Sequence, residues 1–375
     1  MQEIRIPPLI EILTEMSDWR KARGKRYTLK SLLALLVMGL VCGRYSIRSI
    51  SRWGRSLPPK YRKRTGLPQK HSPAPATLCR VLWHVGWAEL EEAIREWGEG
   101  IHEQLIAAGL SDGIAIDGKT IRRAASLGAA NVHLLGAVCH QLRFVLTQLP
   151  VDDKSNEITA IKPLLEKLLL EGMVITLDAL LTQRDVAQQI RKGKGHYVMY
   201  VKGNQPTLQW AIEELFTQPW PAGIMPPARA KTVTKQAGRV EVRDIAVSTA
   251  LNDYLDWPGG QQVFQLTRTT TRRGQTQQKT VYGITSLSPD QASAEQLLQH
   301  IHHHWHAIEN GTHWVRDVVM GEDKSTIHKQ TAPQTMASLR NLAISLIRLA
   351  GFDSITNATD AFAANPAKAL ALLGI

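Results

Sequence analysis

Short apolar runs rich in β-branched residues alternate with amphipathic stretches along the middle of the chain. The runs at 114–117, 132–139 and 143–149 are closely spaced and predict the strands of an antiparallel meander. The segments after them have the periods of helix, strand, helix, strand and helix, at 157–170, 173–178, 182–192, 197–201 and 207–216. Three strands followed by alternating helices and strands predict an α/β fold, with helices packed on the faces of a mixed sheet.

The part of the chain before residue 105 has helical spacing instead. The apolar run after Thr28 predicts a buried helix that begins near Thr28 and ends near Gly43. This run is too short to span a bilayer. Further helices are predicted at 46–53, 76–87 and 88–105, with a Pro-rich break at 56–75. The pattern therefore indicates a separate helical domain over residues 1–105.

The α/β pattern is interrupted once more before the end of the chain. Strict alternation at 240–247, 263–267 and 280–284 predicts strands, and residues 270–274 have the composition of a hairpin turn. We interpret this part, about 228–288, as a β-rich insertion. Two long helices are predicted after it, at 293–319 and 333–350, and residues 351–375 form an uninformative tail.

Positive charge is concentrated in the first domain. The chain has a formal net charge of +12, and the span from Arg20 to Arg80 holds sixteen Lys or Arg and no Asp or Glu. The densest parts are 20–26 and 60–64. A span with many basic residues and no acidic ones indicates a polyanionic partner, and phosphate backbones are the commonest polyanion. A solvated basic face is the alternative, and an anionic membrane is a weaker one because no long amphipathic helix is present.

Cysteine usage favours a reducing compartment. Cys42, Cys79 and Cys139 are odd in number and widely scattered, so they match neither a disulfide framework nor a zinc knuckle. No targeting segment is evident. We expect a cytoplasmic protein without a membrane partner.

Three acidic residues carry the candidate chemistry. Asp117 and Asp178 end the β-branched runs GIAID and VITLD, and Glu309 lies in a segment with helical spacing. An unpaired buried carboxylate is costly, but three that converge make an oxygen-rich site suited to Mg²⁺ or Mn²⁺. Two such ions roughly 4 Å apart promote cleavage of a phosphodiester. The alternative is structural, because an Asp at a strand end often caps the next turn.

Six segments together resemble the DDE transposases of bacterial insertion sequences, most closely the H-repeat-associated branch. They are IDGK at 116–119, KSNEITA at 154–160, TLDALLTQ at 176–183, YVMYVKGNQ at 197–205, IENGTHW at 308–314 and DVVMGED at 317–323. They occur in the family's order and the resemblance covers roughly residues 25–350. It implies a ribonuclease-H-like DDE catalytic domain at 106–350, with the β-rich insertion before the third acid.

The resemblance assigns Asp117, Asp178 and Glu309 as the catalytic, metal-binding acids. Asp117 is expected to bridge two Mg²⁺ or Mn²⁺ ions, with Asp178 on one ion and Glu309 on the other. Related transposases usually carry a Tyr and an Arg before the Glu and a Lys after it. Here His302 and Trp305 precede it. Arg316 follows seven residues later on the same face of an α-helix, where it could supply the phosphate contact of the Lys.

Several polar residues near these acids are candidates for DNA contact. Lys119, Gln183 and Lys202 come just after strand ends, while His306, His313 and Arg316 flank Glu309. In the basic domain the candidates are Arg23, Lys25, Arg26, Arg62, Lys63 and Arg64. A solvated role for Lys202 is equally open, and Asn204 and Gln205 could cap the helix that begins at Pro206.

Two alternative sites remain open. His302, His306, Glu309 and His313 fall on one stripe of an α-helix, a spacing that could bind Zn²⁺. Glu322 could replace Glu309 as the third acid.

We therefore expect a transposase that binds the terminal repeats of its element and target DNA, as a nucleoid-associated homodimer. The alternatives are a DNA-binding protein with a decayed catalytic core, and a metal-dependent nuclease without strand transfer.

Overall fold

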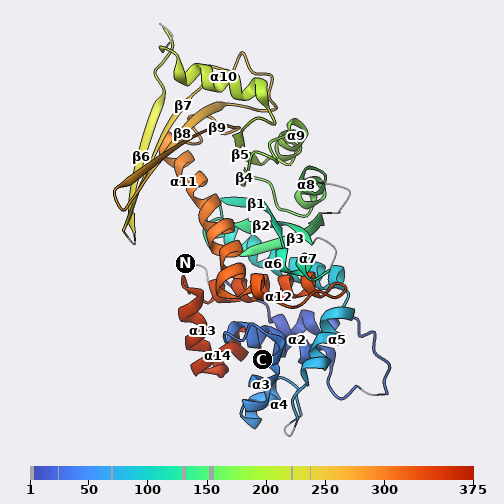
Figure 1. The fold of residues 1–375 in the computed structure, drawn as a ribbon. Coiled ribbons are helices and arrows are strands. Elements are labelled where there is room, and N and C mark those ends of the chain that lie inside the picture. Colours follow the sequence, from blue (N-terminus) through green and yellow to red (C-terminus); the bar gives the residue numbers. More distant parts are fainter. Residues whose placement is uncertain are drawn as a thin grey trace. The chain divides into compact units, whose positions relative to one another are not determined.

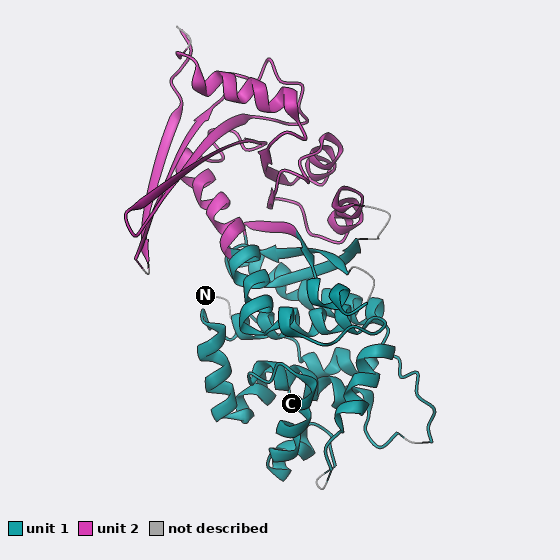
Figure 2. Ribbon diagram, viewed as in Figure 1, with its two compact units in different colours: residues 1–111, 118–154, 307–375 teal, residues 112–117, 155–306 magenta. Residues whose placement is uncertain are grey.

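The computed structural model describes residues 4–23, 25–68, 71–128, 132–151, 156–220, 223–236 and 238–375. The chain forms two compact units (Figures 1 and 2). Unit 1 comprises residues 1–111, 118–154 and 307–375, and unit 2 comprises residues 112–117 and 155–306. Two of the four crossings between the units fall within regular elements, one in a strand after Asp117 and one in a helical segment after His306.

Unit 2 is built on a mixed sheet. The strands are β1 (Gly113–Thr120), β4 (Val174–Leu177), β5 (His196–Val201), β6 (Ala228–Gln236), β7 (Arg239–Ser248), β8 (Gln262–Arg272) and β9 (Gln275–Thr285). These seven strands follow one another within a nine-stranded sheet, in the order β1-β4-β5-β9-β8-β7-β6. β4 is parallel to both β1 and β5, and every later pairing is antiparallel. The expectation of a mixed α/β sheet is confirmed.

The β-rich segment extends this sheet directly. β9 pairs with β5, with Val198 opposite Thr285, so β6 to β9 share a sheet with the strands that precede Asp178. Gly283 permits the packing here, because a Cβ at this position would lie 2.1 Å from the Phe264 ring. The predicted hairpin turn is confirmed at Arg273 and Gly274, whose positive φ angles are those of a type I′ turn.

Helices cover both faces of the unit 2 sheet. They are α8 (Glu157–Glu166), α9 (Arg184–Lys192), α10 (Pro206–Thr217) and α11 (Ala294–His304). The apolar side of α11, with Leu297, Leu298 and Ile301, packs on Ile245 and Leu266 of the sheet. α10 packs against β8 and β9 on the other face (Figure 1).

Unit 1 is mainly helical. Its helices are α1 (Leu9–Glu15), α2 (Leu29–Val41), α3 (Ile47–Ser56), α4 (Pro59–Arg64), α5 (Pro75–His84), α6 (Trp87–Ala107), α7 (Arg122–Ser126), α12 (Ala332–Leu349), α13 (Ile355–Ala364) and α14 (Pro366–Leu372). The hairpin β2 (His133–Cys139) and β3 (Val145–Val151) packs against α6 and α12. The sequence did not predict α1, α4 or α7, and it left α13 and α14 in an uninformative tail.

The predicted helix after Thr28 is confirmed as α2. The Thr28 side chain accepts a hydrogen bond from the Ser31 backbone amide and so caps it, and every α2 residue except Lys30 is buried. α2 packs against α12, which is contributed by the other end of the chain. The N-terminal helices and the C-terminal helices therefore share one core. Among the described residues, no helix combines the length and the apolar character needed to cross a membrane.

Candidate active site

Asp117 and Asp178 leave two neighbouring strands at the same edge of the unit 2 sheet. β1 and β4 are parallel, and Ile116 opposite Leu177 is the last pair between them. The next residue on each strand is the aspartate, so the two backbones are one strand spacing, about 4.8 Å, apart. β1 itself continues to Thr120, so Asp117 lies where pairing with β4 ends rather than at the end of its strand.

The carboxylate of Asp178 is partly buried. Burial raises its pKa; the Leu181 backbone amide, which donates a hydrogen bond to Oδ1 at 3.2 Å, and the charge of Lys202 oppose this, while the charge of Glu157 adds to it. A desolvated carboxylate with another acid nearby favours a cation in its surroundings. Glu157 begins α8 and belongs to the segment KSNEITA, of which residues 154 and 155 lie outside the described part of the chain.

The loop after Asp178 is held by the start of α10. Asn204 Nδ2 donates to the Ala179 carbonyl at 2.6 Å, and Gln205 Nε2 donates to the Thr182 carbonyl at 3.1 Å and to Gln183 Oε1 at 3.2 Å. Neither side chain caps α10. The capping role considered for Asn204 and Gln205 is therefore wrong, because both amides bond to the backbone or side chains of the loop.

Thr176, two residues before Asp178, is tied to helix α11. Its hydroxyl shares a hydrogen bond of 2.9 Å with Nδ1 of His304. Burial lowers the pKa of His304 to about 4, so the imidazole is neutral at neutral pH. The sequence did not single out His304 among its histidine neighbours, and only the packing distinguishes it.

Glu309 lies on a helical segment that changes its winding. After α11 the chain continues as π-helices η1 (Trp305–His313) and η2 (Val315–Val319). The Thr312 hydroxyl donates to the carbonyl of Ala307, five residues earlier. The predicted helix at 293–319 is thus confirmed in extent, but its second half is wound more widely. π-helical turns occur often at functional sites.

The wider winding removes the predicted histidine stripe. Spacings of 3.6 residues per turn no longer apply after Trp305, so His302, His306, Glu309 and His313 do not form the continuous α-helical line that a zinc site would use. Two shorter relationships remain. His302 and His306 stack with ring centroids 5.8 Å apart, and Nδ1 of His313 lies 3.9 Å from Oε2 of Glu309.

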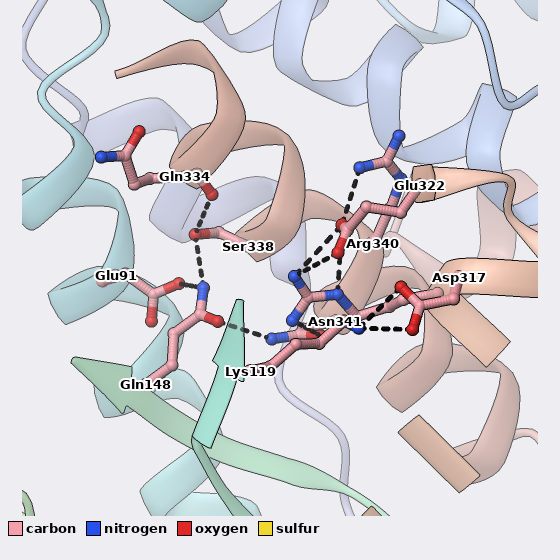
Figure 3. Close-up of polar contacts among 10 residues, drawn as sticks. Glu91, Lys119, Gln148, Asp317, Glu322, Gln334, Ser338, Arg340 and Asn341 are labelled. Carbon is pink, nitrogen blue, oxygen red and sulfur yellow. Dashed lines mark hydrogen bonds and ion pairs between the residues drawn. The ribbon is translucent and has the colours of Figure 1, made fainter. Parts of the chain in front are cut away.

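The end of β1 is joined to η2 by an ion pair. Lys119 Nζ donates to both carboxylate oxygens of Asp317 at 2.6 Å, and only 8% of the Lys119 side chain is exposed (Figure 3). Lys119 follows Asp117 by two residues, and Asp317 follows Glu309 by eight. The side chain that was expected to contact DNA is therefore occupied by a carboxylate of its own unit.

Arg316 and Glu322 form a buried ion pair. Arg316 Nη2 lies 2.8 Å from Glu322 Oε1, and Arg340 Nη1 lies 2.8 Å from Oε2. Burial alone would raise the pKa of Glu322, but the charges of Arg316 and Arg340 outweigh it and lower the pKa to about 2. Glu322 lies in the short helix η3 (Glu322–Lys324), and its carboxylate is thus ion-paired with two arginines.

This network bears on the prediction that Arg316 contacts a DNA phosphate and on the alternative that Glu322 is the third acid. Arg316 is only 2% exposed, so its guanidinium is directed to Glu322 and not to a surface where a DNA phosphate could bind. The pair continues into an amide chain, because Asn341 accepts from Arg316 and donates to Gln148, which donates to Glu91 (Figure 3). The sequence predicted none of these partners. Glu322 is only six residues from Arg316, whereas Gln148 is 193 residues from Asn341.

The comparisons with known proteins agree with one another. A family model described as "Transposase DDE domain" matches residues 108–346, and one described as "DDE_Tnp_1-associated" matches residues 10–98. The protein named "Putative transposase YncI" of Escherichia coli O157:H7 is 30% identical over 357 residues, which cover 92% of this chain and 88% of that protein.

The chain belongs to the transposase DDE domain family.

Further matches to this transposase-family chain have similar coverage. The "H repeat-associated putative transposase YhhI" of Escherichia coli strain K12 is 29% identical over 354 residues, with 92% of this chain and 91% of that protein covered. The expected resemblance to the H-repeat-associated branch is confirmed. A solved piggyBac transposase complex with hairpin DNA matches 96% of this chain and 75% of that chain, at 11% identity and with a TM-score of 0.41.

The remaining DNA-contact candidates of this transposase-family chain lie at the surface or close to it. Lys202 is exposed, as are Arg23, Lys63, Arg64 and His306. The others are Lys25, which pairs with Asp18 at 3.2 Å, the exposed Arg26, and Arg62 and Gln183, which are partly buried. Their roles in DNA contact stay predictions.

Proposed function

We propose that this transposase-family chain cleaves DNA at the ends of an insertion element and joins the freed 3′-hydroxyl to target DNA. The observation that carries the proposal is the pair of aspartates, Asp117 and Asp178, at one edge of the sheet. Parallel strands present their carboxyl ends together, and this is where α/β folds form their sites. We infer a ribonuclease-H-like arrangement of this core.

We propose that Asp117, Asp178 and Glu309 hold divalent metal ions, with Mg²⁺ or Mn²⁺ suited to the all-oxygen donor set. Bound metal would supply an activated nucleophile and neutralise charge on the phosphate. The raised pKa of Asp178 supports a cation at this edge, because burial makes its uncompensated charge unfavourable. His313, 3.9 Å from Glu309, would orient that carboxylate.

Chain connectivity supports the inclusion of Glu309. Asp117 is two residues from Lys119, and an extended backbone of two residues spans about 7 Å. Lys119 in turn is bonded to Asp317, on the helical segment that carries Glu309. The ion pair thus limits how far the segment with the third acid can lie from the first aspartate.

DNA is the proposed partner of the basic surface in unit 1. Arg23, Arg26 and the cationic last turn of α4, with Arg62, Lys63 and Arg64, would bind the terminal repeats. Lys202, Gln183, His306 and His313 would contact DNA near the acids. A homodimer would let two element ends be joined in one complex.

A plasmid assay tests the proposal. Purified protein is incubated with supercoiled plasmid that carries the element's ends, with and without Mg²⁺. Cleavage followed by joining, only with metal, is the expected result. Cleavage alone would instead indicate a nuclease, and a shifted but uncut band would indicate a DNA-binding protein with a decayed core. Neither result would be compatible with strand transfer by this chain.

A further inference from the structure

The face of the unit 2 sheet that contacts α11 changes character halfway along its strands. Near α11 the paired residues are apolar, with Ala230, Ile245, Leu266 and Val281 in one row across β6 to β9. The next row is Thr232, Arg243, Arg268 and Lys279. From this row onward, the described residues of these strands include no apolar side chain on this face.

Three cations thus lie side by side on adjacent strands. Arg243 is directly opposite Arg268, and Arg268 is directly opposite Lys279. Paired positions place Cβ atoms about 5 Å apart, and like charges at that distance oppose pairing. Two rows further on, Arg239 is opposite Arg272, which adds two more cations to the same face.

Among the described residues of this face, one carboxylate is present to balance these five cations. Glu241 forms ion pairs with Arg239 and Arg243. Arg268, Arg272 and Lys279 have no ion-pair partner within the described part of the chain. Burial is the main cause of the lowered pKa of His302, and the charge of Arg243 lowers it further. Arg243 therefore lies close to the end of α11. The surplus charge therefore begins where helix cover ends.

The opposite face of the same strands provides a contrast. There the cations Arg229, Lys231 and Lys235 all lie on β6, the edge strand, and the central strands carry Thr pairs such as Thr267 with Thr280. Lysines on an edge strand are a common protection against edge-to-edge pairing. That explanation does not extend to Arg268, which lies on β8 between two paired strands.

We propose that the row Arg243, Arg268 and Lys279, with Arg272 beside it, is a binding surface for the phosphate backbone of DNA. Neighbouring strands are about 5 Å apart, so the cations on them have a spacing of the same order as successive phosphates. These phosphates advance by about 3.4 Å per nucleotide along the axis of a duplex. The hydroxyl and amide side chains of Thr232, Thr270 and Gln277 add neutral donors. This inference takes from the proposed function only that the anion is DNA.

The test measures equilibrium DNA binding by the full chain without divalent metal. The variant R268Q/K279Q removes two cations from the proposed surface, and K231Q/K235Q removes two from the opposite face as a matched control. A fluorescein-labelled duplex of arbitrary sequence is titrated at several salt concentrations. If both cations meet phosphates, the slope of log K against log salt becomes shallower by about 1.8 in R268Q/K279Q, and it stays near the parental value in the control.

An equal change in both variants, or none in R268Q/K279Q, would overturn the proposal, as would a parent that binds no duplex. Thermal melting checks the fold, and R272Q/K279Q, in which both side chains are exposed, repeats the measurement if Arg268 proves necessary for stability. Because no metal is present, the outcome is independent of catalysis. A parent that binds DNA through this face but fails the plasmid assay would contradict only the proposed reaction.

Discussion

Lys119 and Asp317, 198 residues apart in the chain, form a close ion pair in which Nζ lies 2.6 Å from each carboxylate oxygen. The lysine belongs to the strand that carries Asp117, and the aspartate belongs to the helical segment that carries Glu309. We infer that Lys119 acts as a positioning residue for the proposed acids. It would fix the end of β1 against η2 without touching DNA.

Removal of this pair should impair metal binding more than it impairs the fold. We expect Lys119→Met to leave a partly buried carboxylate unpaired and to cost about 1–3 kcal/mol in the free energy of unfolding. The Mg²⁺ concentration for half-maximal plasmid cleavage should rise. The exchange K119D/D317K restores opposite charges and should recover part of both properties. If the exchange is as impaired as the single variant, the pair has no specific positioning role.

The three acids should be separable from the fold. Alanine at Asp117, Asp178 or Glu309 should abolish plasmid cleavage, while unfolding without metal stays level or shifts to higher temperature because mutual repulsion is relieved. Metal that binds only the folded chain stabilises it by about 2.7 kcal/mol at a concentration one hundred times Kd, so Mg²⁺ should raise the melting temperature of the parent. The variants should respond much less.

Asn310→Ala is the control for these variants, since Asn310 is the exposed neighbour of Glu309. It should cleave and respond to Mg²⁺ like the parent. A Glu309→Ala protein that retains both properties would remove Glu309 from the proposed site.

Glu322 should be essential for stability and not for metal binding. Glu322→Gln would leave Arg316 and Arg340 buried without their counter-charge, and loss of one partner of a buried ion pair typically costs about 3–5 kcal/mol. Asp323→Asn, at the exposed neighbour, should change little. Urea unfolding measures both, and a parental unfolding free energy for Glu322→Gln would contradict the structural role.

The same pair predicts a pH dependence. Arg316 and Arg340 hold the pKa of folded Glu322 at about 2, below its ordinary value of 4.5. Its contribution to stability is therefore complete above pH of about 4.5 and is lost as the pH falls through about 2. The difference in unfolding free energy between parent and Glu322→Gln should shrink over that window. A difference that remains constant down to pH 2 would argue against the charge pairing.

Asn204 should control the loop that follows Asp178. Asn204→Ala removes the hydrogen bond from Nδ2 to the Ala179 carbonyl and leaves that loop held mainly by Gln205 and Thr182. We expect weaker Mg²⁺ dependence of melting, with cleavage restored at high metal concentration. Gln188→Ala, on the exposed side of α9, is the control and should match the parent. Equal behaviour of the two variants would exclude a role for Asn204.

The sequence by itself determined the elements and the chemistry of their ends. The β-branched runs before Asp117 and Asp178 form strands, Thr28 caps the predicted helix, and residues 240–284 contain strands with a turn at Gly274. These features depend on local periodicity and on residues a few positions apart. The six family segments are also short contiguous stretches, so their order along the chain could be recognised from the sequence alone.

Only the tertiary structure decided which side chains are partners. Lys119 and Arg316 are cationic and were expected to contact DNA, yet each is bonded to a carboxylate. The partner of each side chain depends on tertiary contacts and on a change to π-helical winding that hydrophobic periodicity does not encode. Likewise, Arg243, Arg268 and Lys279 are unremarkable in sequence. They become a row of charge because strand register brings together residues far apart in the chain.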